Sequence, residues 1–366
     1  FNYWYPMDFR NTGKDLIQNH MSFSIFNHVA IFPKKHWPVS YGLNGHVMVD
    51  GDKMSKSKGN FITMRQSFID YGADASRFTA LSGGEGIDDA NFDRELAKTM
   101  MLKLSGLLDF AKEYYNEGRD DKKTVDKWMD NKIDFIVKKT SEYYDETLFR
   151  SALQSSYFDM QNALKWYMRR CVNKPNKGTI NKFIEVQAKL LSPIVPFVTE
   201  EIGEVIGQKG FMSITDWPQI KDVMDDRSED IIRDTREDIN SVLTLLKLKS
   251  PKKITLLVAH PWKYELYTIL KAELQNSRDF KVLICAVMKN DSLKRYAKDI
   301  TKIIQKVAKT GIDFVSNQDV EFTTINQSKE FFENEFKAKI EVIKAQDSSE
   351  NKANQAVPGK VAILVE

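Results

Sequence analysis

The sequence predicts a multidomain protein with an α/β region, then an all-α helical bundle, then a small α+β domain. Three observations predict this order. An extended aromatic segment at 3–9 precedes a glycine turn and a run with helical spacing at 16–31. Residues 122–206 show one apolar stripe per helix, and after residue 250 strand and helix periods alternate. We therefore expect domains at 1–92, 93–222 and 223–366.

The composition of the chain limits which ligands, metal sites and cellular compartment we expect. The formal net charge is only +3, so any contact with nucleic acid must come from local basic patches. Cys171 and Cys285 have no CxxC partner and the five histidines are scattered, so we expect no structural zinc or other metal site. Two lone cysteines fit a reducing cytosol, and no apolar run is long enough to cross a bilayer. We expect a cytoplasmic protein without membrane contact.

The first predicted unit is a strand, a turn at Arg10–Gly13 and a helix. In open α/β sheets, ligands dock at such a turn. Gly13 has no side chain, so a sugar can come close, and Asp15 can accept hydrogen bonds from ribose hydroxyls. Alternatively, Asp15 only stabilises the positive end of the helix. The residues leave both interpretations open.

A lysine-rich loop follows the alternating run Gly45–Val49, which predicts a strand. Lys53, Lys56 and Lys58 alternate with small serines before Gly59 and Asn60. A lysine ammonium is a compact charge on a long stem, and it can follow a phosphate through a reaction. The loop therefore suits a polyphosphate, whereas an arbitrary lysine-rich run is more often a solvated surface loop.

Short helices and a turn are predicted next. Residues 63–71 and 74–81 read as helices split by Gly72, with Asp74 as an N-cap. The glycine cluster at 82–86 is a turn, because no lysine follows it at P-loop spacing. The aspartates of 88–93 should cap a long helix that runs to about Tyr115.

The predicted bundle spans Lys122–Ile206, and Pro193 and Pro196 break its last helix. One segment combines aromatic and basic side chains. We expect Trp166 and Tyr167 to pack in the core, whereas Arg169 and Arg170 can pair with RNA phosphates.

The third domain begins with a charged linker at 221–230 and an amphipathic helix at 231–248. Strands are predicted at 254–258, 282–287, 340–343 and 361–365, and helices at 262–274 and 293–307. The polar segment 346–356 should be a mobile loop.

Several of these stretches resemble one family. Lys53-Met54-Ser55-Lys56-Ser57 followed by Gly59-Asn60 resembles the signature loop of class I aminoacyl-tRNA synthetases. Residues 13–20, 26–33 and the His36-Trp37-Pro38 segment resemble leucyl-tRNA synthetases of the archaeal and eukaryotic-cytosolic type. The resemblance implies the second half of a Rossmann-like catalytic domain, an anticodon-binding-type bundle and a C-terminal domain that binds tRNA.

The resemblance also implies roles for individual residues. ATP, with Mg²⁺, is the implied nucleotide substrate, and Lys53 and Lys56 are the implied catalytic residues, with Lys56 the stronger candidate. The implied ATP-binding residues are Gly13, Asp15, His46, Val47, Met48, Lys53, Met54, Ser55, Lys56 and Ser57. The implied tRNA-binding residues are Arg169, Arg170, Val365 and Glu366.

Departures from the family pattern limit the expected activity. The sequence has no His-Ile-Gly-His motif, no first half of the nucleotide fold and no editing insertion. Because residues 1–5 already read as the interior of a domain, we expect a piece of a longer protein that is inactive alone. Its expected partners are leucine, tRNA(Leu) and an N-terminal catalytic and editing half, covalently attached or separate. The alternatives are a non-catalytic tRNA-binding paralogue and a synthetase for isoleucine or valine.

Overall fold

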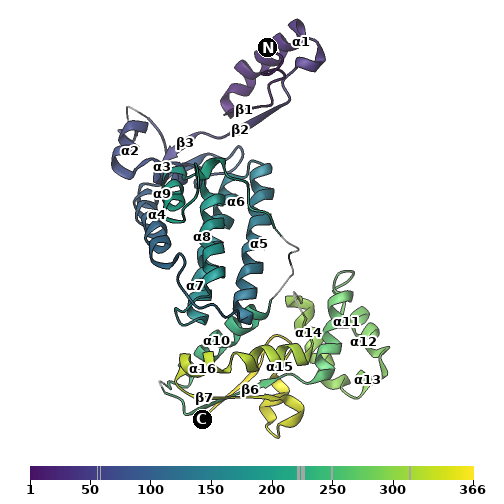
Figure 1. The fold of residues 1–366 in the computed structure, drawn as a ribbon. Coiled ribbons are helices and arrows are strands. Elements are labelled where there is room, and N and C mark those ends of the chain that lie inside the picture. Colours follow the sequence, from purple (N-terminus) through teal and green to yellow (C-terminus); the bar gives the residue numbers. More distant parts are fainter. Residues whose placement is uncertain (56, 58, 221–222, 224–226, 249, 313–314) are drawn as a thin grey trace. The chain divides into compact units, whose positions relative to one another are not determined.

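The computed structural model describes residues 1–366 except 56, 58, 221–222, 224–226, 249 and 313–314 (Figure 1). The chain divides into two compact units, residues 1–224 and 225–366. The α/β region and the helical bundle both lie in the first unit. None of the helices in the described part combines the length and apolar character that a membrane span requires.

Unit 1 begins with a β-α-β arrangement. The strands β1 (Phe9–Gly13) and β2 (Ser40–Asn44) pair in parallel. Parallel neighbours need a crossover connection, and here it is helical, as the 16–31 pattern predicted. The crossover consists of η1 (Lys14–Leu16), η2 (Ile17–Met21) and α1 (Ser22–Ile31), and η3 (Lys34–His36) precedes β2.

The first strand lies later than predicted. Residues 1–5 form a turn in which the amides of Trp4 and Tyr5 donate to the carbonyl of Phe1, and the rings of Phe1 and Tyr5 stack at 4.8 Å. The strand occupies the segment that was predicted to turn. Pairing with β2 fixes this polar segment as a strand, so tertiary hydrogen bonding overrides the β-propensity of the aromatic residues.

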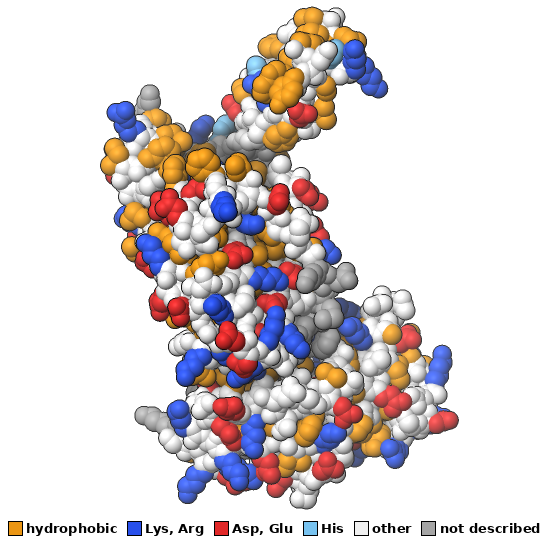
Figure 2. Space-filling view, in the orientation of Figure 1, with side chains coloured by type: hydrophobic (Ala, Val, Ile, Leu, Met, Phe, Trp, Pro, Cys, Tyr) orange, Lys and Arg blue, Asp and Glu red, His pale blue; other side chains and the backbone are white. Residues whose placement is uncertain are grey.

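The N-terminal part exposes an unusual amount of apolar surface. In α1, Phe23, Phe26 and Ile31 are 65, 73 and 70% exposed. Figure 2 shows hydrophobic side chains gathered over this part of the chain and beside α2 (Met64–Tyr71). Parallel sheets are normally covered on both faces. The exposed apolar surface of α1 therefore resembles surface that is buried in most proteins with such sheets.

A second sheet contains the strand predicted at 45–49, which is confirmed for Val47–Val49. Its central strand is β3 (Val47–Val49), with β5 (Ala90–Phe92) parallel on one side and β4 (Asp52–Lys53) antiparallel on the other. The pattern did not predict β5, because three residues of mixed polarity carry no periodic signal.

Two short helices follow the loop, as predicted. Thr63 caps α2 by accepting from the amide of Gln66, and α3 (Ala73–Ser82) begins after Gly72. The predicted N-cap role of Asp74 is wrong. Its carboxylate accepts from the amides of Phe197 and Val198, so it caps the first turn of α9 (Pro196–Val205), a helix distant in sequence.

The bundle is helical over the predicted range, and α5 and α8 lie side by side within it (Figure 1). Asp93 caps its first helix by accepting from the amide of Leu96, and Pro196 begins its last one. Trp166 and Tyr167 are buried, which confirms their packing role. The elements are α4 (Arg94–Tyr114), α5 (Thr124–Asp145), α6 (Phe149–Leu153), η4 (Gln154–Asp159), α7 (Met160–Arg170), α8 (Lys177–Leu191), α9 and η5 (Met212–Ile214).

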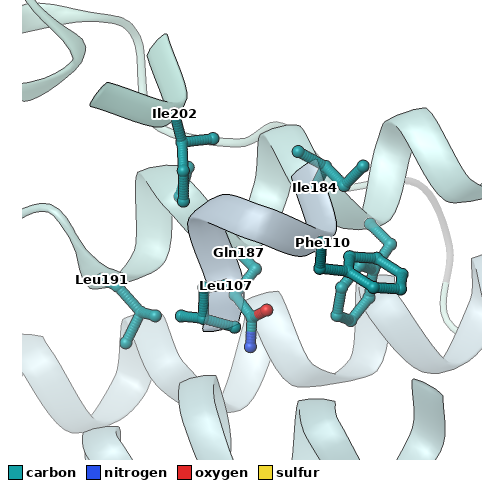
Figure 3. Close-up of a pocket in the computed structure, with 8 residues that line it drawn as sticks. Leu107, Phe110, Ile184, Gln187, Leu191 and Ile202 are labelled. Atoms are coloured by element: carbon teal, nitrogen blue, oxygen red, sulfur yellow. The ribbon is translucent and has the colours of Figure 1, made fainter. Parts of the chain in front are cut away.

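Packing between α4, α8 and α9 leaves a small apolar cavity, shown in Figure 3. Its volume is about 10 Å³, which is at the lower limit for a single water molecule. This cavity is therefore a packing defect of the core and not a ligand site. It is lined by Leu107, Phe110, Phe183, Ile184, Gln187, Ala188, Leu191 and Ile202.

A buried ion pair ties two loops together at one end of the bundle. Arg119 donates to both carboxylate oxygens of Asp126, at 2.6 and 2.8 Å, and the Tyr167 hydroxyl donates to the same carboxylate. The amide of Asn176 donates to the Tyr167 oxygen, and its side chain donates to the carbonyl of Arg119. The α4–α5 and α7–α8 connections are thus joined through one fully buried aspartate.

Unit 2 is an α+β domain. The central strand β6 (Lys253–Val258) pairs in parallel with β7 (Lys339–Lys344) and antiparallel with β8 (Ala362–Val365), so the predicted strands at 254–258, 340–343 and 361–365 are confirmed. The helices are α10 (Ser228–Leu245), α11 (Pro261–Glu273), α12 (Phe280–Met288), α13 (Asp291–Lys294), α14 (Ala297–Thr310), α15 (Gln318–Gln327) and α16 (Lys329–Phe336).

Two predictions in this unit are wrong. The apolar segment 282–287 is part of α12 and not a strand, because an uninterrupted apolar run fits a buried helix as well as a strand. The carboxylate of Asp279 accepts from the amides of Lys281 and Val282 and sets the helical start. The predicted helix at 293–307 is divided into α13 and α14.

The segment 346–356, which was predicted to be a mobile loop, contains short helical turns. It contains η6 (Ala345–Asp347) and η7 (Asn351–Gln355), and Ala356 is fully buried. Lys263 is buried, with the whole residue only 4% exposed, and its ammonium donates to the carbonyls of Asn354 and Ala356 at 2.7 and 2.6 Å. These contacts hold the segment against α11.

Candidate functional site

The lysine-rich loop begins at a tight hairpin between β3 and β4. Asp50 and Gly51 form its two-residue connection with φ angles of 51° and 86°. Two consecutive positive φ angles are typical of a type I′ turn, which favours Asp-Gly and matches the twist of paired strands. Lys53 therefore lies opposite Met48, with its side chain exposed.

Asn60 closes the base of the loop. Its side-chain oxygen accepts from the amide of Ser55 at 2.9 Å, and its side-chain nitrogen donates to the carbonyl of Lys53 at 3.1 Å. The hydroxyls of Ser55 and Ser57 lie 2.8 Å apart. The side chain of Asn60 thus joins the end of the loop to its beginning at Lys53 and Ser55. Lys56, the stronger catalytic candidate, lies outside the described residues.

The hairpin is held by the segment that leads into α4. The amide of Gly51 donates to the Asn91 side chain at 2.7 Å, and the amide of Asp50 donates to the carbonyl of Phe92. A Cβ atom on Gly45 would lie 2.1 Å from the carbonyl oxygen of Asp88. Only glycine at position 45 lets these two backbone segments approach so closely.

Asp89 connects the two sheets of the region. Its Oδ1 atom lies 2.7 Å from the Lys14 ammonium and accepts from the amide of His46 at 2.8 Å. Lys14 also donates to the carbonyl of Ile87. The Lys14 ammonium, followed by the His46 amide, holds the pKa of the Asp89 carboxyl below its ordinary value. The bridge sets the start of the crossover helix against the strand that leads into the loop.

Gly13 and Asp15 lie at the end of β1, on the element that Lys14 anchors. A Cβ atom on Gly13 would come within 2.5 Å of the Asp15 carboxylate, so the missing side chain makes room for that carboxylate. Asp15 is exposed, and none of the described residues donates a hydrogen bond to its carboxylate. It remains available to a hydroxyl-bearing ligand, and its place in the first helical turn also fits the helix-dipole interpretation.

The structure separates the predicted site residues into groups. His46, Val47 and Met48 lie on or beside β3, with His46 and Val47 exposed, and they run directly into the hairpin and the loop. Arg169 and Arg170 lie instead in the last turn of α7 in the bundle. Val365 and Glu366 lie in unit 2, where the Glu366 carbonyl accepts from the amides of Lys252 and Lys253.

Sequence reasoning missed four residues that build this site. Asn60 was noted only as part of a signature, and Lys14, Asp89 and Asn91 were not noted as site residues. The Asp50-Gly51 dipeptide was a readable hairpin signal. Asp89 and Asn91 gave no local signal, because their roles depend on contacts with residues far away in the sequence.

Two family models match the chain. Residues 3–98 match the class I (C) catalytic domain of tRNA synthetases, and residues 126–258 match the anticodon-binding domain of tRNA ligase. The first match contains β1–β5 and the lysine-rich loop, and the second contains most of the bundle. Both domain types agree with the predicted fold of the first two regions.

Relatives match over the whole chain. It is 32% identical to the leucine–tRNA ligases of Pyrococcus abyssi and Aeropyrum pernix and 35% identical to that of Methanococcus vannielii, with 100% of this chain aligned in each case. The chain spans only 38 to 39% of the length of these relatives.

A solved structure shares part of the fold. It is the ternary complex of Agrobacterium radiobacter K84 agnB2 LeuRS with tRNA and LeuAMS, which is 18% identical with a TM-score of 0.50 and covers 66% of this chain and 36% of its own. The likeness extends only to the fold. The relatives align with the whole of this chain, and the two family models match its first two regions. Together they show that this chain belongs to the class I aminoacyl-tRNA synthetases and corresponds to a part of a leucine–tRNA ligase.

Proposed function

We propose that this chain supplies the phosphate-binding loop and the tRNA-binding domains of a leucyl-tRNA synthetase, which activates leucine with ATP and transfers it to tRNA(Leu). The observation that carries the proposal is the loop itself. Lys53 lies at the end of the β3–β4 hairpin, and the Asn60 side chain bonds to Ser55 and Lys53, so the base of the loop is fixed beside the proposed phosphate site.

In the proposed reaction the leucine carboxylate attacks the α-phosphate of ATP, and pyrophosphate leaves. ATP enters with its magnesium ion as substrate. Negative charge grows on the departing phosphates, so Lys53 and Lys56 stabilise the transition state more than the bound substrate. Each lysine is expected to contribute roughly 2 to 4 kcal/mol, or about 10² to 10³ in rate.

The nucleoside end of ATP is assigned to the neighbouring elements. Asp15 accepts from the ribose hydroxyls beside Gly13, and the strand of His46, Val47 and Met48 lies against the adenine. The Lys14–Asp89–His46 bridge supports this assignment, because it links the two elements through contacts of 2.7 and 2.8 Å. Met54, Ser55 and Ser57 complete the phosphate side of the site.

A further polypeptide segment completes the catalytic domain in this proposal. The exposed side chains of α1 and the uncovered parallel strands β1 and β2 support it. In the relatives, more than half of the length lies outside the region that this chain matches. The segment is the N-terminal catalytic and editing half, attached covalently or assembled as a separate subunit.

The remaining domains bind tRNA in this proposal. Arg169 and Arg170 on the bundle pair with phosphates, and unit 2, including Val365 and Glu366, contacts the outer part of the tRNA. Removal of 225–366 should weaken tRNA binding and spare leucine activation in the assembled enzyme. The deletion should include α10, because this helix packs against α15 and β8 of the same unit.

Leucine-dependent ATP–pyrophosphate exchange tests the catalytic part. The chain assembled with the missing half should support exchange, and Lys53→Ala and Lys56→Ala should each lower it by about 10² to 10³. Lys98→Ala is the matched control, since this exposed lysine pairs with Glu95 on α4. A stable complex that binds tRNA without any exchange would favour a non-catalytic paralogue. Exchange with isoleucine or valine instead of leucine would identify that amino acid as the substrate.

A further inference from the structure

Helix α14 presents four lysines on one face. Lys298, Lys302, Lys306 and Lys309 follow one another at intervals of four, four and three residues, which places them on the same side of a helix. All four are exposed. The opposite face is fixed in the core of unit 2, where Ile300, Ile304 and Val307 are at most 3% exposed. The lysine face therefore cannot rotate away from solvent.

These lysines carry charge of one sign without compensation. Asp299 is the one acidic residue in the α14 sequence, and within the described part of the chain no carboxylate lies at ion-pair distance from any of the four lysines. Other lysines of this unit differ: Lys253 pairs with Glu341 and Lys344 with Asp319, at 2.7 and 2.6 Å. Like charges at i,i+4 destabilise a helix, so this face suits a polyanion that supplies the missing negative charge.

An aromatic platform adjoins the first turn of the helix. The rings of Trp262 and Tyr296 stack with centroids 4.3 Å apart, and the Arg295 guanidinium lies 4.8 Å from the Tyr296 ring centroid. Basic side chains next to partly exposed stacked rings are typical of surfaces that bind nucleic acid. A membrane-surface helix instead inserts exposed apolar residues, whereas the apolar residues at the centre of α14 are buried against unit 2.

We propose that the lysine face of α14, together with Arg295 and Tyr296, binds the phosphate backbone of RNA. This inference rests on the proposed function, since the RNA is the tRNA that the enzyme charges. It gives unit 2 a defined docking surface, and it locates a local basic patch in a chain whose net charge is only +3. The contact between these side chains and the RNA phosphates is electrostatic and does not depend on the base sequence.

The test compares two triple variants of the full chain. Lys298→Gln/Lys302→Gln/Lys306→Gln removes three unpaired charges, and Lys253→Gln/Lys329→Gln/Lys344→Gln removes three lysines that pair with carboxylates. Both variants lose the same net charge. Binding of a tRNA(Leu) transcript is measured by fluorescence anisotropy between low and moderate salt.

In the first variant the slope of log K against log[salt], which is negative, should become less negative by roughly 2 to 3, because each phosphate contact contributes about −0.9. The control should change the slope by less than about 1. Equal slopes for wild type and the first variant would overturn the inference and leave the proposed function intact. Absence of tRNA binding by the wild type, also after assembly with the missing half, would overturn both.

A lipid surface is tested in parallel. Vesicles of phosphatidylcholine with one-third phosphatidylserine are mixed with the same three proteins. If the first variant loses vesicle binding and keeps the wild-type affinity and salt slope for tRNA, the face contacts a membrane, and the RNA assignment is wrong. Glutamine has nearly the helix propensity of lysine, so circular dichroism of each variant should show the wild-type helix content.

Discussion

The ammonium of Lys14 lies 2.7 Å from the carboxylate of Asp89, and the same carboxylate oxygen accepts from the amide of His46. One side chain thus joins the helix that follows β1 to the strand that leads into the lysine-rich loop. Because the lysine and the amide both stabilise the ionised form, the pKa of Asp89 is held low.

Asp89→Ala should release this junction. The His46 amide loses its acceptor, so hydrogen–deuterium exchange at His46 should accelerate, and Lys14→Met should produce a smaller change because the acceptor remains. Asp88→Asn, at the exposed neighbouring position, is the control. In the wild type, the protection factor of the His46 amide, which corrects for the intrinsic pH dependence of exchange, should also fall in acid. The stabilising contribution of ionised Asp89 is complete above the ordinary aspartate pKa and is lost as the pH falls through the lowered value. Unchanged His46 exchange in Asp89→Ala would contradict the bridge.

Asn60→Ala should open the base of the lysine-rich loop. It removes the hydrogen bonds to Ser55 and Lys53, each worth about 1 kcal/mol net, or roughly fivefold in the population of open states. Limited trypsin digestion reports this directly, since the loop contains three lysines. Asn60→Asp keeps the acceptor for Ser55 and should lie between Ala and wild type. Identical cleavage rates in all three proteins would show that Asn60 does not hold the loop.

Two glycine substitutions should have opposite effects on the stability of unit 1. Gly45→Ala places a methyl group 2.1 Å from the Asp88 carbonyl and should destabilise unit 1 by roughly 1 to 3 kcal/mol. Gly106→Ala, within α4, meets no described atom within 4 Å and should stabilise it by about 1 kcal/mol. Urea unfolding followed by 5-fluorotryptophan resonances of Trp128 and Trp166 measures both. A stabilising Gly45→Ala would refute the close approach of these backbones.

Lys263 should make the stability of unit 2 depend on pH. Burial lowers its pKa to about 8, while Asp299 opposes the shift weakly. Below this value both the folded and the unfolded states are protonated, and the desolvation cost is complete. Between pH 8 and the ordinary value of 10.5 the folded state loses its proton first, so the free energy of unfolding rises by up to roughly 3 kcal/mol.

Lys263→Met should abolish this rise. Unfolding of unit 2 is measured from pH 7.5 to 10 with 5-fluorotryptophan at Trp262, the single tryptophan of the unit. His260, whose pKa is lowered by burial, titrates below this range in both proteins. Parallel pH dependence in wild type and variant would show that the ammonium is not desolvated.

The sequence by itself determined the order of the regions, nearly all of the bundle and the lysine-rich loop. Helices such as α5 and α8 carry a local period of apolar residues, and helical hydrogen bonds join near neighbours, so a short window contains the information. The resemblance of the loop and the 13–33 segment likewise resides in contiguous residues, and the relatives confirm the family that they indicated.

Only the tertiary structure decided the contacts between distant segments. It moved the first strand to Phe9–Gly13 because β2 pairs there, made 280–288 a helix, and assigned Asp74 to cap α9 instead of its own helix. It also gave Asp89 its role. In each case the stabilising partner lies far away in sequence, or the local pattern fits two structures equally well. A strand pair or a bridging carboxylate depends on which distant segment of the chain packs beside it, and a local sequence pattern does not contain that information.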